Sequence, residues 1–356
     1  MRSRRFVEIN LTLDTLIIYF FNMSLKESIK QLQKRERMTQ DELFRRLGFP
    51  RSSIMEYQTI EAKTAFELAF GYSDANEPSV ETNKKSSRSK ELEKLLPWVR
   101  KFPIRALQKM GHIPTNIKDA GLVRAVFRFM NIGSIAGFEK YYGVTLQSTN
   151  PQTYAAWIRL GELQIKRLAG DFTPNTEAVL TNLKFLRTNG FLHAQNIRKI
   201  AREALHSCGI EVIEVEPFLT APTPTCAFYW RGYQPVIQFP TTKMDDSKFL
   251  EALFHAVAHA IYHPLRTSCL QLGVHAQQTP ETKSILEIEA ETFAQDMALS
   301  EAEECELICC GHFNERRCIQ HFSGLFHVRP GILVERLQQQ GKISRRTPLN
   351  DFKVAV

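Results

Sequence analysis

The sequence predicts a mostly helical protein of the α+β class, with a small sheet in its last third. Through most of the chain, apolar residues recur at helical spacing, and turn residues separate one helical stretch from the next. Residues 210–239 differ, because β-branched and aromatic residues gather there in short runs typical of strands. At 356 residues, the chain is long enough for two or three domains with separate cores.

The composition is that of an ordinary globular protein, with 43% hydrophobic and 24% charged residues. A formal net charge of +8 permits a polyanionic partner without demanding one. The seven cysteines form no regular framework and their number is odd, which fits free thiols in a reducing cytosol better than a secreted disulfide scaffold. We therefore expect a cytoplasmic protein.

The first residues superficially resemble a signal peptide, because arginines near Met1 precede an apolar run over residues 11–21. That run contains Asp14, is too short to span a bilayer, and is not followed by a small-residue cleavage site. We expect residues 1–22 to be an extension outside the fold, with Met23 as the alternative start, and we expect no membrane partner.

Residues 23–71 are predicted to form a helix-turn-helix domain. Thr39 and the acidic residues after it can begin a helix that runs through Leu47. Gly48 ends that helix, and Pro50 opens the next one. In a helix-turn-helix, the second helix enters the major groove of DNA.

This stretch resembles the phage-repressor-like helix-turn-helix family. The resemblance is carried by Gln40, Leu43, Leu47, Gly48, Phe49, Ser52 and Ile54. It implies a homodimer on operator DNA, with four residues facing phosphates and bases: Gln40, Arg51, Ser52 and Ser53. Phe44 departs from the family pattern, which has a small residue where two helices cross closely. A helical interaction module that does not touch DNA is the alternative.

The middle of the chain is predicted to be a linker followed by helices. Residues 72–92 contain almost nothing to bury, which indicates a flexible, solvated linker. Over residues 93–190 the apolar spacing is helical again, interrupted at glycines and prolines. This segment predicts a helical domain and, alone, nothing about function.

The last predicted domain covers residues 191–353. A helix that stops at Gly209 precedes a strand over residues 210–215, and further strands over 225–230 and 235–239 form a hairpin. Strands so close in sequence pair antiparallel by default, so we expect a small antiparallel sheet with a helix lying against it.

That helix carries His255 and His259, which share one face because residues four apart stack one turn apart. This is the ligand spacing of the zinc-peptidase motif H-E-x-x-H, whose glutamate acts as general base. The glutamate position here is Ala256, and the sequence does not tell whether this alanine is natural or engineered. Peptidase zinc takes a third protein ligand. We predict Glu287, because Ala290 on the same helix face allows close packing.

Other groups near this helix have secondary roles. Glu289 is the second choice for the third ligand, and His263 is expected beside the ligands or on the surface. Glu251 is one turn before His255 and is the candidate for a substitute base, although it lies on the far side of a ligand. Loss of a general base typically costs roughly 10²–10⁴-fold in rate. The alternative to a metal site is that His255 and His259 are ordinary half-buried residues of the helix.

The surrounding sequence is similar to the ImmA/IrrE family of bacterial zinc-peptidase-like domains, which often follow a phage-repressor-like helix-turn-helix. The similarity is carried by residues 252–263, 287–294, 235–238 and the tail from Phe322 to Lys353. It implies a zincin-like fold and a zinc ion held by His255, His259 and Glu287. The segment from Leu95 also resembles the middle region of long members, many of which are antitoxin-type regulators.

The sequence therefore predicts a bacterial DNA-binding regulator or antitoxin. Its partners would be operator DNA and a toxin or repressor protein, and its degenerate zinc-peptidase-like domain would act as a sensor or partner-binding module. One alternative is an active zinc metallopeptidase that cleaves a repressor. Another is a protein-interaction antitoxin without DNA binding.

Several cysteines and histidines gather in the segment 305–321, but their spacing fits no zinc-finger pair. We expect ordinary half-buried thiols between helices there rather than a second metal site.

Overall fold

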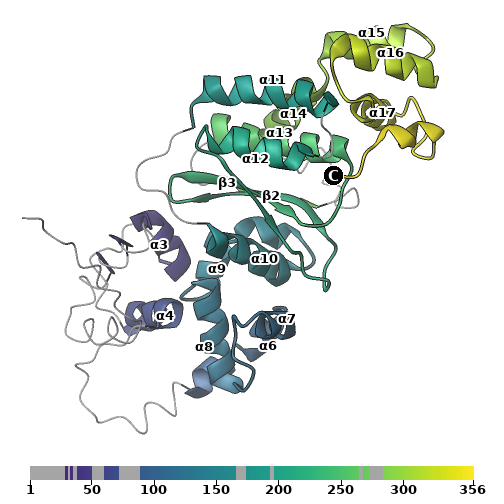
Figure 1. Ribbon diagram of the computed structural model, residues 1–356. Helices are drawn as coiled ribbons and strands as arrows, with labels where there is room; N and C mark the ends of the chain where they lie inside the picture. The colour runs from purple at the N-terminus through teal and green to yellow at the C-terminus, as the bar shows by residue number, and fades with distance from the viewer. Residues whose placement is uncertain are drawn as a thin grey trace, which may run out of the picture. The chain divides into compact units, whose positions relative to one another are not determined.

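The computed structural model describes residues 29–30, 33–34, 38–49, 60–71, 89–165, 174–192, 196–263, 268–272 and 284–356. Within them the protein is mostly helical with one four-stranded sheet, which confirms the predicted α+β class (Figure 1). The chain forms two compact units, Met1–Leu146 and Gln147–Val356. In the part of the chain described, no helix has the length and apolar character needed to cross a membrane.

The described part of the first unit is helical. Its helices are α3 (Gln40–Leu47), α4 (Ile60–Phe70), α6 (Leu96–Val99), α7 (Ile104–Lys109), α8 (Asp119–Met130), α9 (Ile135–Tyr141) and the 3-10 helix η2 (Gly143–Gln147). Thr39 caps α3 as predicted, because its hydroxyl accepts a hydrogen bond from the Glu42 N–H at 3.1 Å. Gly48 ends α3 in the left-handed conformation, with φ at 90°.

Helix α3 packs against α9. A β-carbon at Gly137 of α9 would lie 2.2 Å from the Arg46 carbonyl oxygen, so this approach requires glycine. The Arg46 guanidinium is fully buried, pairs with Glu42 at 3.2 Å and lies 3.6 Å from the ring centroid of Tyr141. The helices of the predicted helix-turn-helix region therefore share a unit with those after residue 89.

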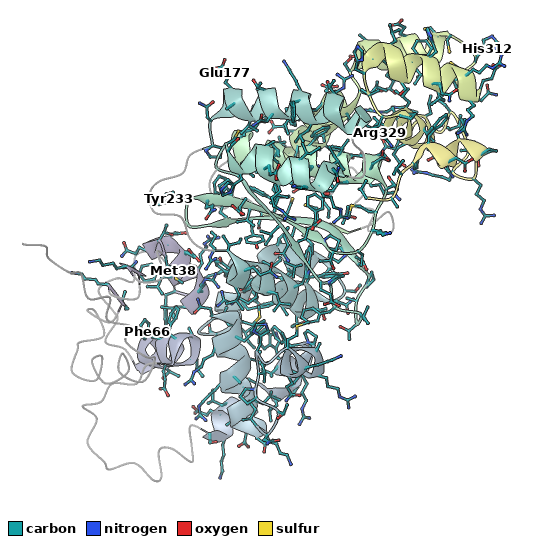
Figure 2. All side chains as sticks on the ribbon, in the orientation of Figure 1. Met38, Phe66, Glu177, Tyr233, His312 and Arg329 are labelled. Atoms are coloured by element: carbon teal, nitrogen blue, oxygen red, sulfur yellow. The ribbon has the colours of Figure 1, made fainter. Side chains whose placement is uncertain are left out.

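Apolar side chains of α3 and α4 meet in a core that includes Met38 and Phe66, both labelled in Figure 2. Phe44, the residue that departs from the repressor pattern, is buried at 2% exposure. Most of the predicted linker, residues 72–88, lies outside the described residues.

The second unit contains a sheet with strand order β1-β3-β2-β4. The strands are β1 (Glu211–Val215), β2 (Pro224–Arg231), β3 (Gln234–Pro240) and β4 (Cys269–Leu272). Strands β2 and β3 form the predicted antiparallel hairpin. The expectation of a purely antiparallel sheet is wrong, because β1 pairs with β3 in parallel. The first three strands reverse direction in turn, but β3 inserts between β1 and β2 and therefore runs alongside β1. Strand β4 was not predicted.

Helices cover both faces of this sheet. Figure 1 shows α10 (Pro151–Gln164) on one side of β2 and β3, and α12 (Ile197–His206) and α13 (Asp246–Tyr262) on the other. The Trp157 indole N–H donates to the Val215 carbonyl at 3.1 Å, and the Gln238 amide donates to the Trp157 carbonyl at 2.9 Å. These contacts place α10 in the second unit.

Helix α11 (Thr176–Leu192) packs against α12 and against α14 (Ile285–Ala298). The predicted helical domain of residues 93–190 is therefore not one unit. Its first part belongs with α3 and α4, and α10 and α11 belong with the sheet. The physical reason is that α10 and α11 bury their apolar faces on the sheet layer and on α12.

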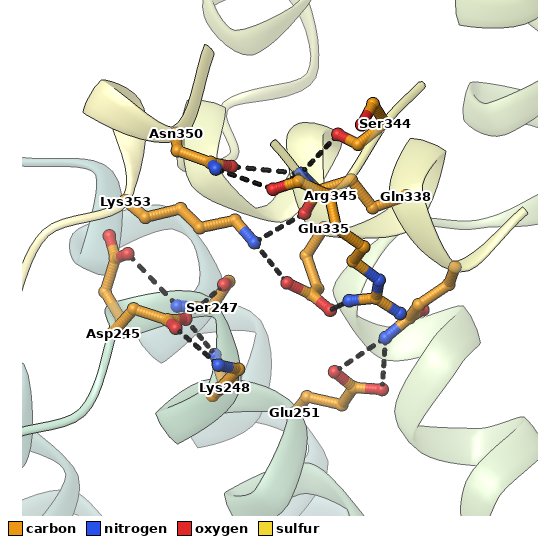
Figure 3. A network of polar contacts seen from close by, with 12 residues as sticks. Asp245, Ser247, Lys248, Glu251, Glu335, Gln338, Ser344, Arg345, Asn350 and Lys353 are labelled. Atoms are coloured by element: carbon orange, nitrogen blue, oxygen red, sulfur yellow. Dashed lines mark hydrogen bonds and ion pairs between the residues drawn. The ribbon is translucent and has the colours of Figure 1, made fainter. Parts of the chain in front are cut away.

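The chain ends in α15 (Glu301–Cys309), α16 (Arg316–Phe326), α17 (Pro330–Gln339) and the 3-10 helix η5 (Pro348–Phe352). Arg329, labelled in Figure 2, pairs with Asp246 at the start of α13 at 2.6 Å. Lys353 reaches Glu335 and donates to the Gln338 side chain at 2.8 Å (Figure 3). These contacts fasten the end of the chain to α17 and the start of α17 to α13.

Candidate metal centre

Helix α13 positions the histidine pair. Asp245 caps it by accepting a hydrogen bond from the Lys248 N–H at 2.9 Å (Figure 3). Beyond the cap, Phe249, Leu253 and Val257 are buried in the core shared with the sheet. This apolar packing fixes the rotation of the helix, so its histidine face is directed toward α14.

The structure brings together the three residues predicted as ligands. The Nε2 atoms of His255 and His259 lie 3.1 Å apart. The Glu287 carboxylate on α14 lies 3.2 Å from His255 Nε2 and 3.5 Å from His259 Nε2. Ala290 and Ala294, at 0% and 1% exposure, let α14 approach α13 as the sequence indicated.

These donors fit a zinc ion. Two ligands bonded to a tetrahedral zinc at its usual bond lengths lie about 3.3 Å apart. The two imidazole nitrogens lie 3.1 Å apart, and the Glu287 oxygens lie 3.2 Å (Oε2 to His255) and 3.5 Å (Oε1 to His259) from them, which is close to that value. Imidazole nitrogen and carboxylate oxygen are also the donors typical of peptidase zinc.

The electrostatics favour the forms that bind metal. Burial lowers the pKa of His259, although the Glu287 carboxylate opposes this shift. Burial raises the pKa of Glu287, but hydrogen bonds from His255 and His259 outweigh it and hold that pKa well below its usual range. A neutral imidazole and an ionised carboxylate are the states that metal coordination requires.

His263 and Glu289 lie on the side of His259 that faces away from His255 and Glu287. His263 Nδ1 lies 2.7 Å from His259 Nδ1, and His263 Nε2 lies 3.2 Å from the Glu289 carboxylate. His259 therefore turns Nε2 toward His255 and Glu287, and its other nitrogen is held by His263. Glu289, the second choice for the third ligand, contacts His263 instead.

The general-base position is apolar and closed. Ala256 has 0% exposure and belongs to the apolar core. Glu251, the candidate substitute, is directed toward α17, where the Gln339 amide donates to its two carboxylate oxygens at 3.0 and 3.1 Å (Figure 3). Burial raises the pKa of Glu251. Its hydrogen bonds to Gln339 of α17 remove it from consideration as a base.

Sequence reasoning missed Cys269, the first residue of β4. It pairs with Phe228 of β2, whose ring stacks on His259 at 5.8 Å between centroids. The Cys269 sulfur and one donor atom from each of His255 and His259 all lie within 4.8 Å of one another. No spacing rule signals this residue, since it reaches the site only through the pairing of a four-residue edge strand.

The predicted DNA contacts lie elsewhere. Gln40 begins α3 and is exposed, whereas Arg51, Ser52 and Ser53 fall outside the described residues.

The expectation of half-buried thiols in the cysteine-rich segment holds for Cys310 and Cys318, whose sulfurs lie 3.1 Å apart. Cys305 and Cys309 are instead exposed. Within the described part of the chain, this segment contributes no group of three donors at ligand distance.

No family model, no curated protein and no solved structure matches this chain.

Proposed function

We propose that the second unit is a zinc-binding, peptidase-like domain without efficient peptidase activity. It would act as the sensing or partner-binding part of a bacterial DNA-binding regulator or antitoxin. One observation carries the proposal: His255, His259 and Glu287, which come from two helices, bring two imidazole nitrogens and one carboxylate together at separations suited to zinc.

Zinc held there would act as a Lewis acid and would lower the pKa of a bound water. Hydrolysis of a peptide further needs a general base to take the proton from that water. Position 256 offers a methyl group, and the nearby Glu251 is hydrogen-bonded to α17. The domain is therefore suited to hold a metal and poorly suited to cleave a peptide.

The surroundings of Ala256 support the same conclusion. This alanine has zero exposure and belongs to the apolar core, so a carboxylate at this position would be buried.

The regulatory part of the proposal rests on the helix-turn-helix resemblance. The cap of α3 at Thr39, its end at Gly48 and the exposed Gln40 agree with the pattern from which that resemblance was drawn. The proposed partners are operator DNA and a toxin or repressor protein, with a homodimer as the DNA-bound form.

The metal content of the purified full chain tests the first part. We expect about one zinc per chain after loading and dialysis, and loss of that zinc in the His255→Ala and His259→Ala variants. His206→Ala is a matched control, because His206 also pairs with a carboxylate, Glu211 at 2.9 Å, but lies outside the cluster. A protein that retains no zinc would refute the metal centre.

Peptidase activity is tested beside it with fluorescent casein. We expect no cleavage above the level of the His259→Ala variant. Cleavage that depends on His259 would instead establish the active-metallopeptidase alternative.

DNA binding is tested by selecting duplexes from a random-sequence library and measuring gel shifts on them. Arg51→Ala and Ser52→Ala are expected to weaken the specific complex and leave salt-dependent residual binding. Failure to enrich any sequence, or unchanged binding by these variants, would favour the interaction-module alternative.

A further inference from the structure

Strand β4 carries a thiol to the histidine pair. Cys269 is 3% exposed, and its sulfur lies in the same small volume as the donor nitrogens of His255 and His259. The strand is held there by antiparallel pairing with β2, in which Cys269 lies opposite Phe228. Phe228 in turn stacks on the His259 ring, so β2 holds both the thiol and one imidazole in place.

We propose that Cys269 is a fourth protein ligand of the centre formed by His255, His259 and Glu287, which makes the metal site closed and structural rather than open and catalytic. This inference rests on the proposed zinc-binding function and extends it. The metal would be a zinc-like divalent ion, and the sulfur would release its proton to solvent when it binds.

The geometry needs little adjustment. In a tetrahedral zinc site, sulfur and nitrogen ligands lie roughly 3.6 Å apart. The Cys269 sulfur is within 4.8 Å of one ring nitrogen of each histidine, so a shift of at most about 1.2 Å brings it to ligand distance from both. Glu287 is not part of that group of three, and its carboxylate would complete the site from α14. Such a shift is within reach of a small side-chain rotation on a short edge strand.

The number of protein ligands distinguishes a structural zinc site from a catalytic one. Catalytic zinc sites have three protein ligands and leave one position for water, whereas structural sites have four and are closed. Nitrogen, oxygen and sulfur donors from α13, α14 and β4 would also tie the two helices to the sheet edge. A structural zinc of this kind contributes directly to the stability of its domain.

Cys269 differs from the other buried thiols of this unit. Cys226 on the neighbouring strand β2 is equally buried, but it is not part of the donor group. Cys208 is occupied by hydrogen bonds with Asn182 at 2.9 Å and Ala204 at 3.6 Å. Cys226 is therefore the matched control.

Cobalt(II) added to the metal-free full chain tests the ligand directly, because sulfur bonded to cobalt gives a charge-transfer absorption in the near ultraviolet. We expect this band in the wild type and in Cys226→Ser. In Cys269→Ser we expect the band to disappear and cobalt affinity to fall by at least about tenfold. Circular dichroism before metal addition checks that both variants are folded.

X-ray absorption of the zinc-loaded wild type tests the ligand without any variant. We expect one sulfur scatterer at about 2.3 Å together with nitrogen and oxygen scatterers. Metal bound in equal amount without a sulfur scatterer or band would overturn the fourth ligand and leave the three-ligand site standing. A chain that binds neither cobalt nor zinc would overturn the proposed function as well.

Discussion

Replacing His263 by alanine is expected to weaken zinc binding without removing a ligand. The side chain is 1% exposed and stands between the proposed ligand His259, at 2.7 Å, and the Glu289 carboxylate, at 3.2 Å. It therefore fixes the ring orientation of His259 and raises its basicity as a ligand. Without it, the His259 ring is freer to turn, and its Nδ1 is left without this partner in a buried place.

The magnitude follows from the two contacts. Loss of such a supporting partner typically costs roughly 10- to 100-fold in metal affinity, which corresponds to about 1.4–2.7 kcal/mol. Glu289→Gln should cost less than His263→Ala, because the Glu289 side chain is 60% exposed and water screens its charge. We thus expect an order of effects: His263→Ala largest, Glu289→Gln smaller, His206→Ala none.

Competition with a chromophoric zinc chelator measures these affinities, and circular dichroism of the metal-free proteins controls for folding. If His263→Ala binds zinc as tightly as the wild type, His259 does not use Nε2 as a ligand oriented by His263. The same result would mean that the contact at Nδ1 is only core packing.

Three further outcomes are expected from other parts of the structure. In a urea titration, Gly137→Ala should lower the free energy of unfolding by about 1–3 kcal/mol, because its β-carbon would lie 2.2 Å from a backbone oxygen of α3. Gly121→Ala is the control and should be neutral or stabilising, because the nearest atom to its β-carbon is 3.8 Å away. Burial raises the pKa of Asp245, but hydrogen bonds from Ser247 and Lys248 at the start of α13 outweigh it, and the folded pKa lies below the ordinary value. The ionised Asp245 therefore stabilises the folded protein above pH about 4, and this stabilisation is lost as the pH falls through the folded pKa. Asp245→Asn should therefore differ most from the wild type in free energy of unfolding near neutral pH and least in acid, and a constant difference would contradict this. The oxidant diamide should join Cys310 and Cys318 in a disulfide, because their sulfurs lie 3.1 Å apart, and mass spectrometry should show the loss of two hydrogens. The reaction should be slow at neutral pH, because burial and the Cys310 contact raise the pKa of Cys318 to about 12. A product without the disulfide at alkaline pH would refute the pairing.

The parts of the site that could be predicted from the sequence are those set by local helix geometry. His255 and His259 share a face because residues four apart always do in a helix. Glu287 was found because the alanine three positions later indicated where two helices approach, and Ala290 is indeed fully buried. The same reasoning placed the cap of α3 at Thr39 and its end at Gly48.

The parts that could not be predicted depend on contacts between distant segments. Cys269 reaches the histidines only through the pairing of β4 with β2, and a four-residue strand leaves no periodic signal. The parallel pairing of β1 with β3 depends on which strand inserts between which neighbours, and sequence spacing does not encode that choice. Sequence spacing also does not encode the contact of Trp157 with Val215, which places α10 with the sheet and not in the predicted helical domain.

Ala256 and Cys269 bear on the same chemical step from two sides. The alanine removes the group that would accept a proton from a metal-bound water, and the thiol would occupy the coordination position that this water needs. A glutamate restored at position 256 would then be a base without a water to act on, and it would also bury a carboxylate where the exposure is 0%. We therefore expect Ala256→Glu alone to leave casein uncleaved and to lower the melting temperature. Any gain in cleavage should require Cys269→Ala in the same chain; cleavage by the single variant would show that the coordination position was open all along.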